Sequence, residues 1–105
     1  MKTITVQELD AKLKAGETLQ LIDVREADEI EICSIKGTHI PMGEVLSRVE
    51  EIKRDIPVVI HCKSGARSGA VITALENNLG LTNLSNLQGG ILAWAAEIDP
   101  SLEVY

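Results

Sequence analysis

The chain has 105 residues, of which 45% are hydrophobic and 25% charged, a composition typical of a globular domain rather than a disordered segment. We therefore expect residues 1–105 to form one domain. The formal net charge of −6 opposes binding to nucleic acid or to an anionic membrane. With no Phe, one Trp and one Tyr, the chain also has too few aromatic side chains to stack single-stranded nucleic acid.

The sequence favours a cytoplasmic location. It contains no apolar run long enough to span a membrane, and its N-terminus MKTITVQELD lacks the pattern of a signal peptide. In the cytoplasm Cys33 and Cys62 should be reduced rather than joined in a disulfide. They are 29 positions apart and lack the clustered Cys and His residues of a zinc site, so we expect neither a metal ion nor another cofactor.

Strands and helices are expected to alternate from the N-terminus. A short strand at 3–6 leads into a helix that starts with a capping box, Thr5 with Glu8, and ends at Gly16. The elements expected next are an apolar strand at 19–24, an acidic helix at 26–31, a strand at 38–40 and a helix at 43–54.

The second half continues the alternation. The most strand-like segment, 57–62, precedes a helix from about Ser68 to Leu79, and a last strand at 83–87 precedes a closing helix after Gly89. Such alternation predicts an α/β fold with about five parallel strands and helices on both faces of the sheet. Ligands of such sheets bind at the carboxyl ends of the strands.

The stretch HCKSGARSG at 61–69 lies at the carboxyl end of the most buried strand expected, where a site should be. Its Cys62 can act as a nucleophile only as a thiolate. The backbone N–H groups of a tight loop, the N-terminus of the next helix and the charge of Arg67 would all favour that thiolate. We therefore interpret Cys62 as a nucleophile rather than as a buried structural cysteine.

The other loop residues suit a small anionic ligand. Ser64 and Ala66 are small, and Gly65 allows the backbone to curl inward. Lys63 adds a positive charge to a loop without acidic residues and could steer a substrate. Ser68 is interpreted either as the N-cap of the following helix or as a ligand.

Four segments together resemble the rhodanese family: LIDVREADEIEI, KGTHIPMGEV, VVIHCKSGARSGA and NLQGGILAW. They follow the family's order and span nearly the whole chain. The resemblance implies a rhodanese-like α/β fold in which Cys62 carries sulfane sulfur as a persulfide and residues 63–67 form the cradle around it. The DVR segment at 23–25 and the GGILAW segment at 89–94 match the family's two other signatures.

Three residues are expected to support the site. The resemblance implies that Asp23 pairs with a loop arginine, the alternative being a solvent-exposed aspartate in a turn. Arg25 is interpreted as a structural partner of nearby acidic residues rather than as a ligand. His61 should point to the face of the strand opposite to Cys62, as a hydrogen-bonded structural histidine or, alternatively, as a group that tunes the thiolate.

Cys33, Ser34 and Trp94 are expected to have structural roles. Cys33 and Ser34 stand where the family commonly has Gly and His. We expect Cys33 to be a small buried residue, the alternative being a resolving thiol. Trp94 is expected in the core.

Cysteine phosphatases and arsenate reductases are an alternative class, because the phosphatases share the order strand, Cys, loop, Arg and helix. Phosphatases place five residues between Cys and Arg, whereas four separate Cys62 from Arg67. The smaller ring of N–H donors suits one additional sulfur atom better than a phosphoryl group. The acidic runs at 25–31 and 44–53 are interpreted as solvated helix faces, so no general acid is evident. A non-catalytic rhodanese-like binding module is the third class, although such modules often lack the cysteine.

We therefore predict a sulfurtransferase. Cys62 would take sulfur from thiosulfate or a protein persulfide and pass it to a thiophilic acceptor, which is cyanide in vitro. The segments EIEICSIKGTHIPMGEV and LAWAAEIDPSLEVY further resemble the rhodanese domains fused to adenylating enzymes of molybdopterin and thiamine biosynthesis. That resemblance implies a ubiquitin-like sulfur-carrier protein as acceptor, and a cysteine desulfurase is the protein persulfide expected as an alternative donor to thiosulfate.

Overall fold

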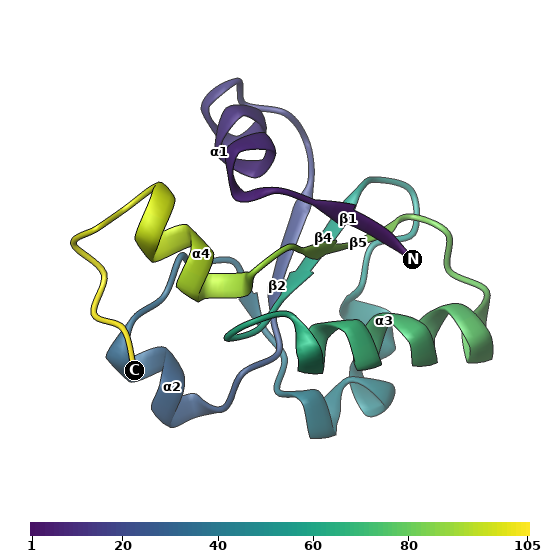
Figure 1. Ribbon diagram of the computed structural model, residues 1–105. Helices are drawn as coiled ribbons and strands as arrows, with labels where there is room; N and C mark the ends of the chain where they lie inside the picture. The colour runs from purple at the N-terminus through teal and green to yellow at the C-terminus, as the bar shows by residue number, and fades with distance from the viewer.

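The computed structural model describes all 105 residues and contains one five-stranded parallel sheet (Figure 1). Its strands are β1 (Lys2–Ile4), β2 (Gln20–Asp23), β3 (Thr38–His39), β4 (Val58–His61) and β5 (Leu84–Leu87). Their spatial order is β1-β5-β4-β2-β3, and every neighbouring pair is parallel. The prediction of an α/β fold with about five parallel strands is therefore confirmed.

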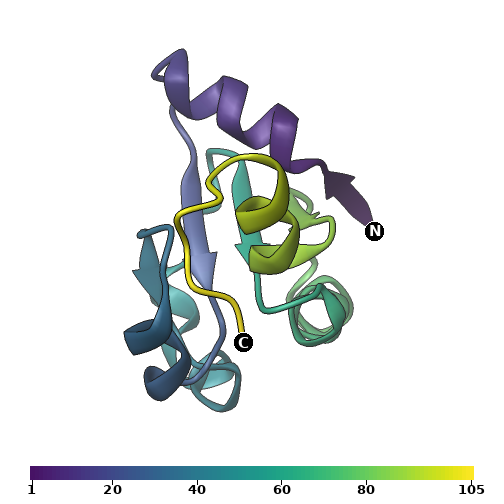
Figure 2. The same ribbon diagram turned by 60° about the vertical axis from the view of Figure 1, so that its left-hand side comes forward.

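The helices lie on both sides of this sheet. They are α1 (Val6–Lys14), α2 (Ala27–Ile32), α3 (Ala66–Leu79) and α4 (Gly90–Glu97), together with two 3-10 helices, η1 (Met42–Glu44) and η2 (Leu46–Glu51). Figures 1 and 2 show α1 and α3 on opposite sides of the strands. None of the helices has the combination of length and apolar character that crossing a bilayer requires.

The capping box predicted at the start of α1 is present. The N–H of Glu8 donates to Thr5 Oγ1 at 3.1 Å, and the N–H of Thr5 donates to Glu8 Oε1 at 2.9 Å. Two of the N–H groups that a helix N-terminus leaves without partners are thereby satisfied. At the other end, Gly16 takes a φ of +70°, which turns the chain towards β2.

All four residues of the central strand β4 are buried, because helices cover both of its faces. Val58 and Ile60 belong to the larger of two apolar clusters, which is shared with α3. Val59 belongs to the smaller cluster, which is shared with α1 and α4 and includes Trp94, as predicted. Since side chains alternate along a strand, Cys62, just after β4, lies on the same face as Val58 and Ile60 and joins the larger cluster.

The prediction of a helix at 43–54 is wrong in type, because the structure has two short 3-10 helices, η1 and η2, in this region. Gly43 is a poor helix former, and the Ser47 hydroxyl donates to the carbonyl oxygen of Glu44 at 2.9 Å, where it competes with the helical hydrogen bonds. Arg48 then leaves helical geometry, with φ −125° and ψ 25°. The apolar periodicity of the segment is real, but its local hydrogen bonds favour the tighter turns.

The turn between β5 and α4 packs on the backbone that follows β4. Ile91 N–H donates to the carbonyl oxygen of Cys62 at 3.0 Å, and Leu92 N–H donates to that of Lys63 at 3.1 Å. Gly90 makes this approach possible, because a Cβ atom there would lie 2.7 Å from the Cys62 oxygen and would clash with the Lys63 carbonyl. Gly90 thus allows the N–H groups of Ile91 and Leu92 to hold the backbone of Cys62 and Lys63 in place.

We expect Gly90→Ala to destabilise the protein more than Gly80→Ala. Both glycines have positive φ, +59° and +66°, but a Cβ at Gly80 would meet no atom within 4 Å. Backbone strain alone predicts a loss of about 1–2 kcal/mol for Gly80→Ala, and the added clash predicts about 2–5 kcal/mol for Gly90→Ala. Urea unfolding of the two variants measures the difference, and equal losses would show that the close approach has no energetic weight.

Candidate functional site

Residues 62–65 form a tight loop between β4 and α3. Gly65 is the N-cap of α3 and has a φ of +111°, so the chain turns into the helix at Ala66. The prediction that this helix starts near Ser68 is therefore wrong, and of the two alternatives for Ser68 the N-cap is excluded. Only a residue that tolerates left-handed φ can make so sharp a turn, and Gly65 places the helix start two residues early.

The loop wraps around the sulfur of Cys62. The N–H of Gly65 donates to Sγ at 3.1 Å, and the hydroxyl of Ser68 lies 3.4 Å from it. Cys62 is only 1% exposed and packs in the apolar cluster shared with α3. The five surface hollows of the molecule are lined by residues outside 61–68, so the thiol is enclosed rather than open to a cleft.

These hydrogen bonds decide the acidity of the thiol. Burial raises the pKa of Cys62, because a thiolate is poorly stabilised away from water. The Ser68 hydroxyl and the backbone N–H groups of Ser68, Gly65 and Ser64 outweigh burial, and the net effect lowers the pKa of Cys62 below its ordinary value. The predicted preference for a thiolate thus has a physical basis in the loop's hydrogen bonds.

Asn86 in β5 holds Ser68 in place, and sequence reasoning missed it. Asn86 Oδ1 lies 2.6 Å from Ser68 Oγ, and Asn86 Nδ2 donates to the carbonyl oxygen of Gly65 at 3.1 Å. A hydroxyl has one proton to donate, and a charged sulfur is a stronger acceptor than an amide oxygen. Ionisation of Cys62 therefore favours rotation of the Ser68 hydroxyl towards sulfur. Ser85, the neighbour of Asn86 in β5, is also polar, so the sequence carries no signal that singles out Asn86.

Replacing Ser68 with Ala is expected to raise the pKa of Cys62 and to slow its alkylation by iodoacetamide at neutral pH several-fold. A hydrogen bond to a charged group contributes about 1.5–3 kcal/mol, and this variant removes one. The matched control is Ser64→Ala, because the Ser64 side chain is exposed and makes no hydrogen bond to sulfur. Alkylation rates are measured across pH from the modified peptide that contains Cys62. Equal pH–rate profiles for Ser68→Ala and Ser64→Ala would contradict a role of the Ser68 hydroxyl in lowering the pKa.

Asp23 and Arg25 form a buried ion pair beside the loop. Arg25 Nε donates to Asp23 Oδ1 at 3.1 Å, and Nη2 donates to Oδ2 at 2.8 Å. Asp23 was expected either to pair with an arginine of the Cys62 loop or to lie exposed in a turn. Neither is correct, because Asp23 pairs with Arg25 and both residues are buried. The interpretation of Arg25 as the partner of a nearby acidic residue is confirmed. Burial of this guanidinium requires such a partner, because an unpaired buried charge is very costly.

The loop arginine pairs instead with Glu29 of α2. Arg67 Nη1 donates to Glu29 Oε1 at 2.6 Å, and Nη2 donates to Oε2 at 2.8 Å, a two-bond ion pair. No hydrogen bond joins Arg67 to the sulfur of Cys62. The interpretation of the acidic run at 25–31 as a solvated helix face is therefore wrong for Glu29. Its neighbours look alike in sequence, so only the fold distinguishes it.

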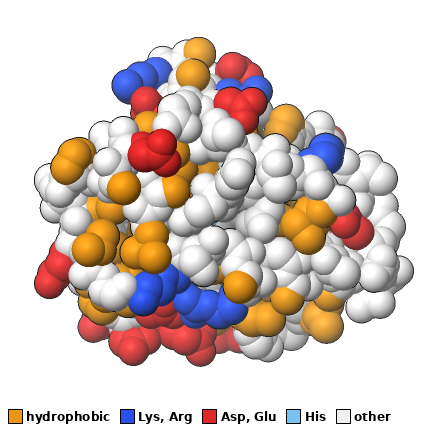
Figure 3. Space-filling view, in the orientation of Figure 1, with side chains coloured by type: hydrophobic (Ala, Val, Ile, Leu, Met, Phe, Trp, Pro, Cys, Tyr) orange, Lys and Arg blue, Asp and Glu red, His pale blue; other side chains and the backbone are white.

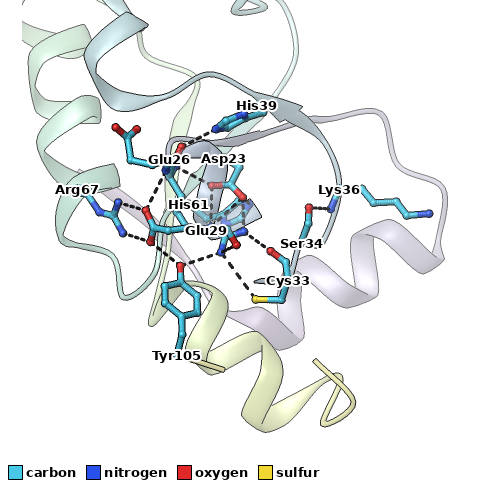
Figure 4. Close-up of polar contacts among 11 residues, drawn as sticks. Asp23, Glu26, Glu29, Cys33, Ser34, Lys36, His39, His61, Arg67 and Tyr105 are labelled. Atoms are coloured by element: carbon cyan, nitrogen blue, oxygen red, sulfur yellow. Dashed lines mark hydrogen bonds and ion pairs between the residues drawn. The ribbon is translucent and has the colours of Figure 1, made fainter. Parts of the chain in front are cut away.

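The C-terminal segment returns to the same place, which the sequence did not predict. The hydroxyl of Tyr105 donates to Glu29 Oε2 at 2.6 Å and accepts from Arg25 Nη1 at 2.9 Å. Lys63 Nζ lies 4.4 Å from the centre of the Tyr105 ring, a cation–π contact. Figure 4 shows Glu29 between Arg67 and Tyr105. This network joins the loop, α2 and the chain after α4.

His61 is buried beside Asp23, and neither ring nitrogen has a hydrogen-bond partner. Its Nε2 lies 3.6 Å from Asp23 Oδ2, whose carboxylate is already engaged by Arg25. The prediction that the His61 side chain is hydrogen-bonded is therefore wrong. Burial lowers the pKa of His61, while the charge of Asp23 raises it and that of Arg25 lowers it further, so the net shift is downward. The ring is neutral at neutral pH.

Stability should therefore decrease as the pH falls below about 6.5, where an unfolded histidine gains a proton that folded His61 cannot accept. The slope reaches up to about 1.4 kcal/mol per pH unit for one proton. Above about pH 5 most carboxylates stay ionised. Because the lowered pKa of Cys62 acts in the same direction, the His61→Gln variant is needed to assign the effect to His61. Urea unfolding at several pH values should show this decrease in wild type and a weaker one in His61→Gln. An unchanged pH dependence in the variant would assign the effect to another group.

No three His, Cys, Asp or Glu side chains gather where they could hold a metal ion. What the site offers is a buried thiol with a lowered pKa, ringed by N–H and O–H donors at the carboxyl end of the central strand. This combination defines an α/β domain built around a nucleophilic-cysteine loop.

The chain belongs to the rhodanese-like family. The family model for the Rhodanese-like domain matches residues 5–97. The chain is 37% identical to the putative sulfurtransferase YtwF of Bacillus subtilis, over 95% of this chain and 96% of that protein. It is 35% identical to the probable adenylyltransferase/sulfurtransferase MoeZ of Mycobacterium tuberculosis, over 98% of this chain but only 27% of MoeZ.

A solved structure has the same fold. The rhodanese-like domain protein from Staphylococcus aureus superposes with a TM-score of 0.82 and is 32% identical. The match covers 100% of this chain and 99% of that one. The resemblance drawn from the sequence segments, including that to domains fused to adenylating enzymes, is confirmed by these relatives.

Proposed function

We propose that this protein is a sulfurtransferase in which Cys62 carries sulfane sulfur as a persulfide. The observation that carries the proposal is the enclosed Sγ, which accepts hydrogen bonds from Gly65 and Ser68 and whose pKa is lowered by them. A lowered pKa increases the fraction of Cys62 that is thiolate, and the thiolate is the nucleophilic form. The sulfurtransferase names of YtwF and MoeZ agree with it.

The reaction has two balanced steps. The Cys62 thiolate attacks the outer sulfur of a donor, a new S–S bond forms, and the donor's own bond to that sulfur breaks with its electron pair. Thiosulfate would release sulfite in this step, and a persulfide would release a thiolate. In the second step a thiophilic acceptor attacks the outer sulfur, breaks the new bond and restores the Cys62 thiolate.

The loop would stabilise the charge on the transferred sulfur. The N–H groups around Ser64 and Gly65 and the hydroxyl of Ser68 already face Sγ, and a terminal persulfide sulfur needs donors of this kind. Lys63 and Arg67 lie at the rim of the loop, where they contact Tyr105 and Glu29, and the side chain of Ala66 between them is small. Asp23, Arg25 and His61 have a supporting role behind the loop.

The partners belong to the proposal as well. The donor would be a small sulfur-containing anion or the persulfide of a cysteine desulfurase, and the acceptor a ubiquitin-like sulfur-carrier protein. The likeness to MoeZ, whose name joins an adenylyltransferase to a sulfurtransferase, supports the sulfur-carrier part. In this proposal residues 1–105 act as one rhodanese domain in the cytoplasm.

Incubation with glutathione persulfide or thiosulfate should increase the intact mass of the protein by one sulfur atom, and cyanide should remove it. Cys62→Ser should gain no sulfur, whereas Cys33→Ser, the matched control, should still gain it. If the wild-type protein gains no sulfur from either donor, the proposal fails. Hydrolysis of p-nitrophenyl phosphate that depends on Cys62 would instead favour a phosphatase.

A further inference from the structure

Both cationic side chains of the loop are already engaged within the molecule. Arg67 makes its two-bond ion pair with Glu29, whose side chain is 14% exposed and that of Arg67 34%. Lys63 lies over the ring of Tyr105. Figure 3 likewise shows basic side chains directly against acidic ones near α2 and the beginning of α3. The loop therefore presents much less free positive charge than its sequence indicates.

Glu29 is held in this position from three sides. Arg67 binds both carboxylate oxygens, the Tyr105 hydroxyl donates to Oε2, and the N–H of Glu26 donates to Oε1 at 3.0 Å. The hydrogen bonds from Arg67 hold the pKa of Glu29 far below its usual range, although burial opposes them. The negative charge is therefore permanent at every pH at which the protein would work.

A fixed carboxylate at the rim affects donors according to their charge. Thiosulfate carries two negative charges, and its attack by Cys62 releases sulfite, which is also a dianion. To bind near Arg67, thiosulfate must displace Glu29 or accept its repulsion, which is strong in a partly buried site. A persulfide R–S–SH carries at most one charge on its reacting sulfur, so Glu29 opposes it far less.

We propose that Glu29, held by Tyr105, is a specificity-determining residue that occupies the loop arginine and selects persulfides over dianionic thiosulfate as sulfur donors. The inference rests on the proposed function. Its reaction is attack of the Cys62 thiolate on the outer sulfur of R–S–SH. The S–S bond of the donor breaks, R–S⁻ leaves with the electron pair, and Cys62–S–SH keeps the proton.

The test compares Glu29→Gln with Glu31→Gln. Both remove one negative charge from α2, but Glu31 is exposed and makes no ion pair. The kcat/KM for thiosulfate divided by that for glutathione persulfide should rise about tenfold in Glu29→Gln and less than about twofold in Glu31→Gln. Tyr105→Phe, which keeps the ring over Lys63 but removes the hydroxyl, should raise the same ratio about threefold.

A second measurement does not require sulfur transfer. Iodoacetate is anionic and iodoacetamide neutral, so the ratio of their rates at the Cys62 peptide reports the charge around the thiol. This ratio should increase about threefold or more in Glu29→Gln and stay unchanged in Glu31→Gln. Thermal unfolding of each variant checks that the fold is intact.

The outcomes separate the two proposals. If glutathione persulfide loads wild-type Cys62 but both ratios in Glu29→Gln equal those in Glu31→Gln, the role of Glu29 is overturned and the sulfurtransferase stands. If neither donor loads wild type, the sulfurtransferase fails, and with it the selection of donors. The inference is supported if both ratios increase in Glu29→Gln, the donor ratio increases in Tyr105→Phe, and Glu31→Gln stays near wild type.

Discussion

A buried sulfur atom can be ionised only if hydrogen bonds replace the water that it has lost, and the structure around Cys62 is organised by this constraint. β4 carries the cysteine into the apolar cluster shared with α3, where desolvation alone would keep it a neutral thiol. The left-handed turn at Gly65 then brings N–H groups and the Ser68 hydroxyl back onto Sγ. The approach of Gly90 from the next turn fixes the carbonyl side of the same backbone.

A network of charged and polar side chains lies beside the Cys62 loop, and Arg25 connects the three segments that contribute to it. The guanidinium contacts the Asp23 carboxylate in β2, the Cys33 carbonyl oxygen after α2 and the Tyr105 hydroxyl near the C-terminus. Breaking such a buried network by removing one partner costs several kcal/mol, because the other charge is left unpaired. The segments that frame the loop are therefore held by polar contacts, whereas the sheet beneath them is held by aliphatic packing.

The sequence was sufficient to predict the fold and the position of the Cys62 loop after β4, but not the contacts around that loop. Strand periodicity, the Thr5 capping box and the apolar run of β4 are local signals, and each led to the right element. The tighter turns near Arg48 depend on side-chain hydrogen bonds that a periodic pattern does not contain. The partners Glu29 and Tyr105 are 38 and 80 positions from the arginines that they contact, and only tertiary folding selects them.

The 1% exposure of Cys62 also has a consequence for the rates of reactions at its sulfur. A group enclosed in this way reacts only when the surrounding segments open, so local opening sets an upper limit on the rate of every reaction at Sγ. A sulfur atom stored there would be shielded from oxidants and chance thiols between openings. Its lifetime would then be governed by the dynamics of the loop and the C-terminal segment rather than by the intrinsic reactivity of the S–S bond.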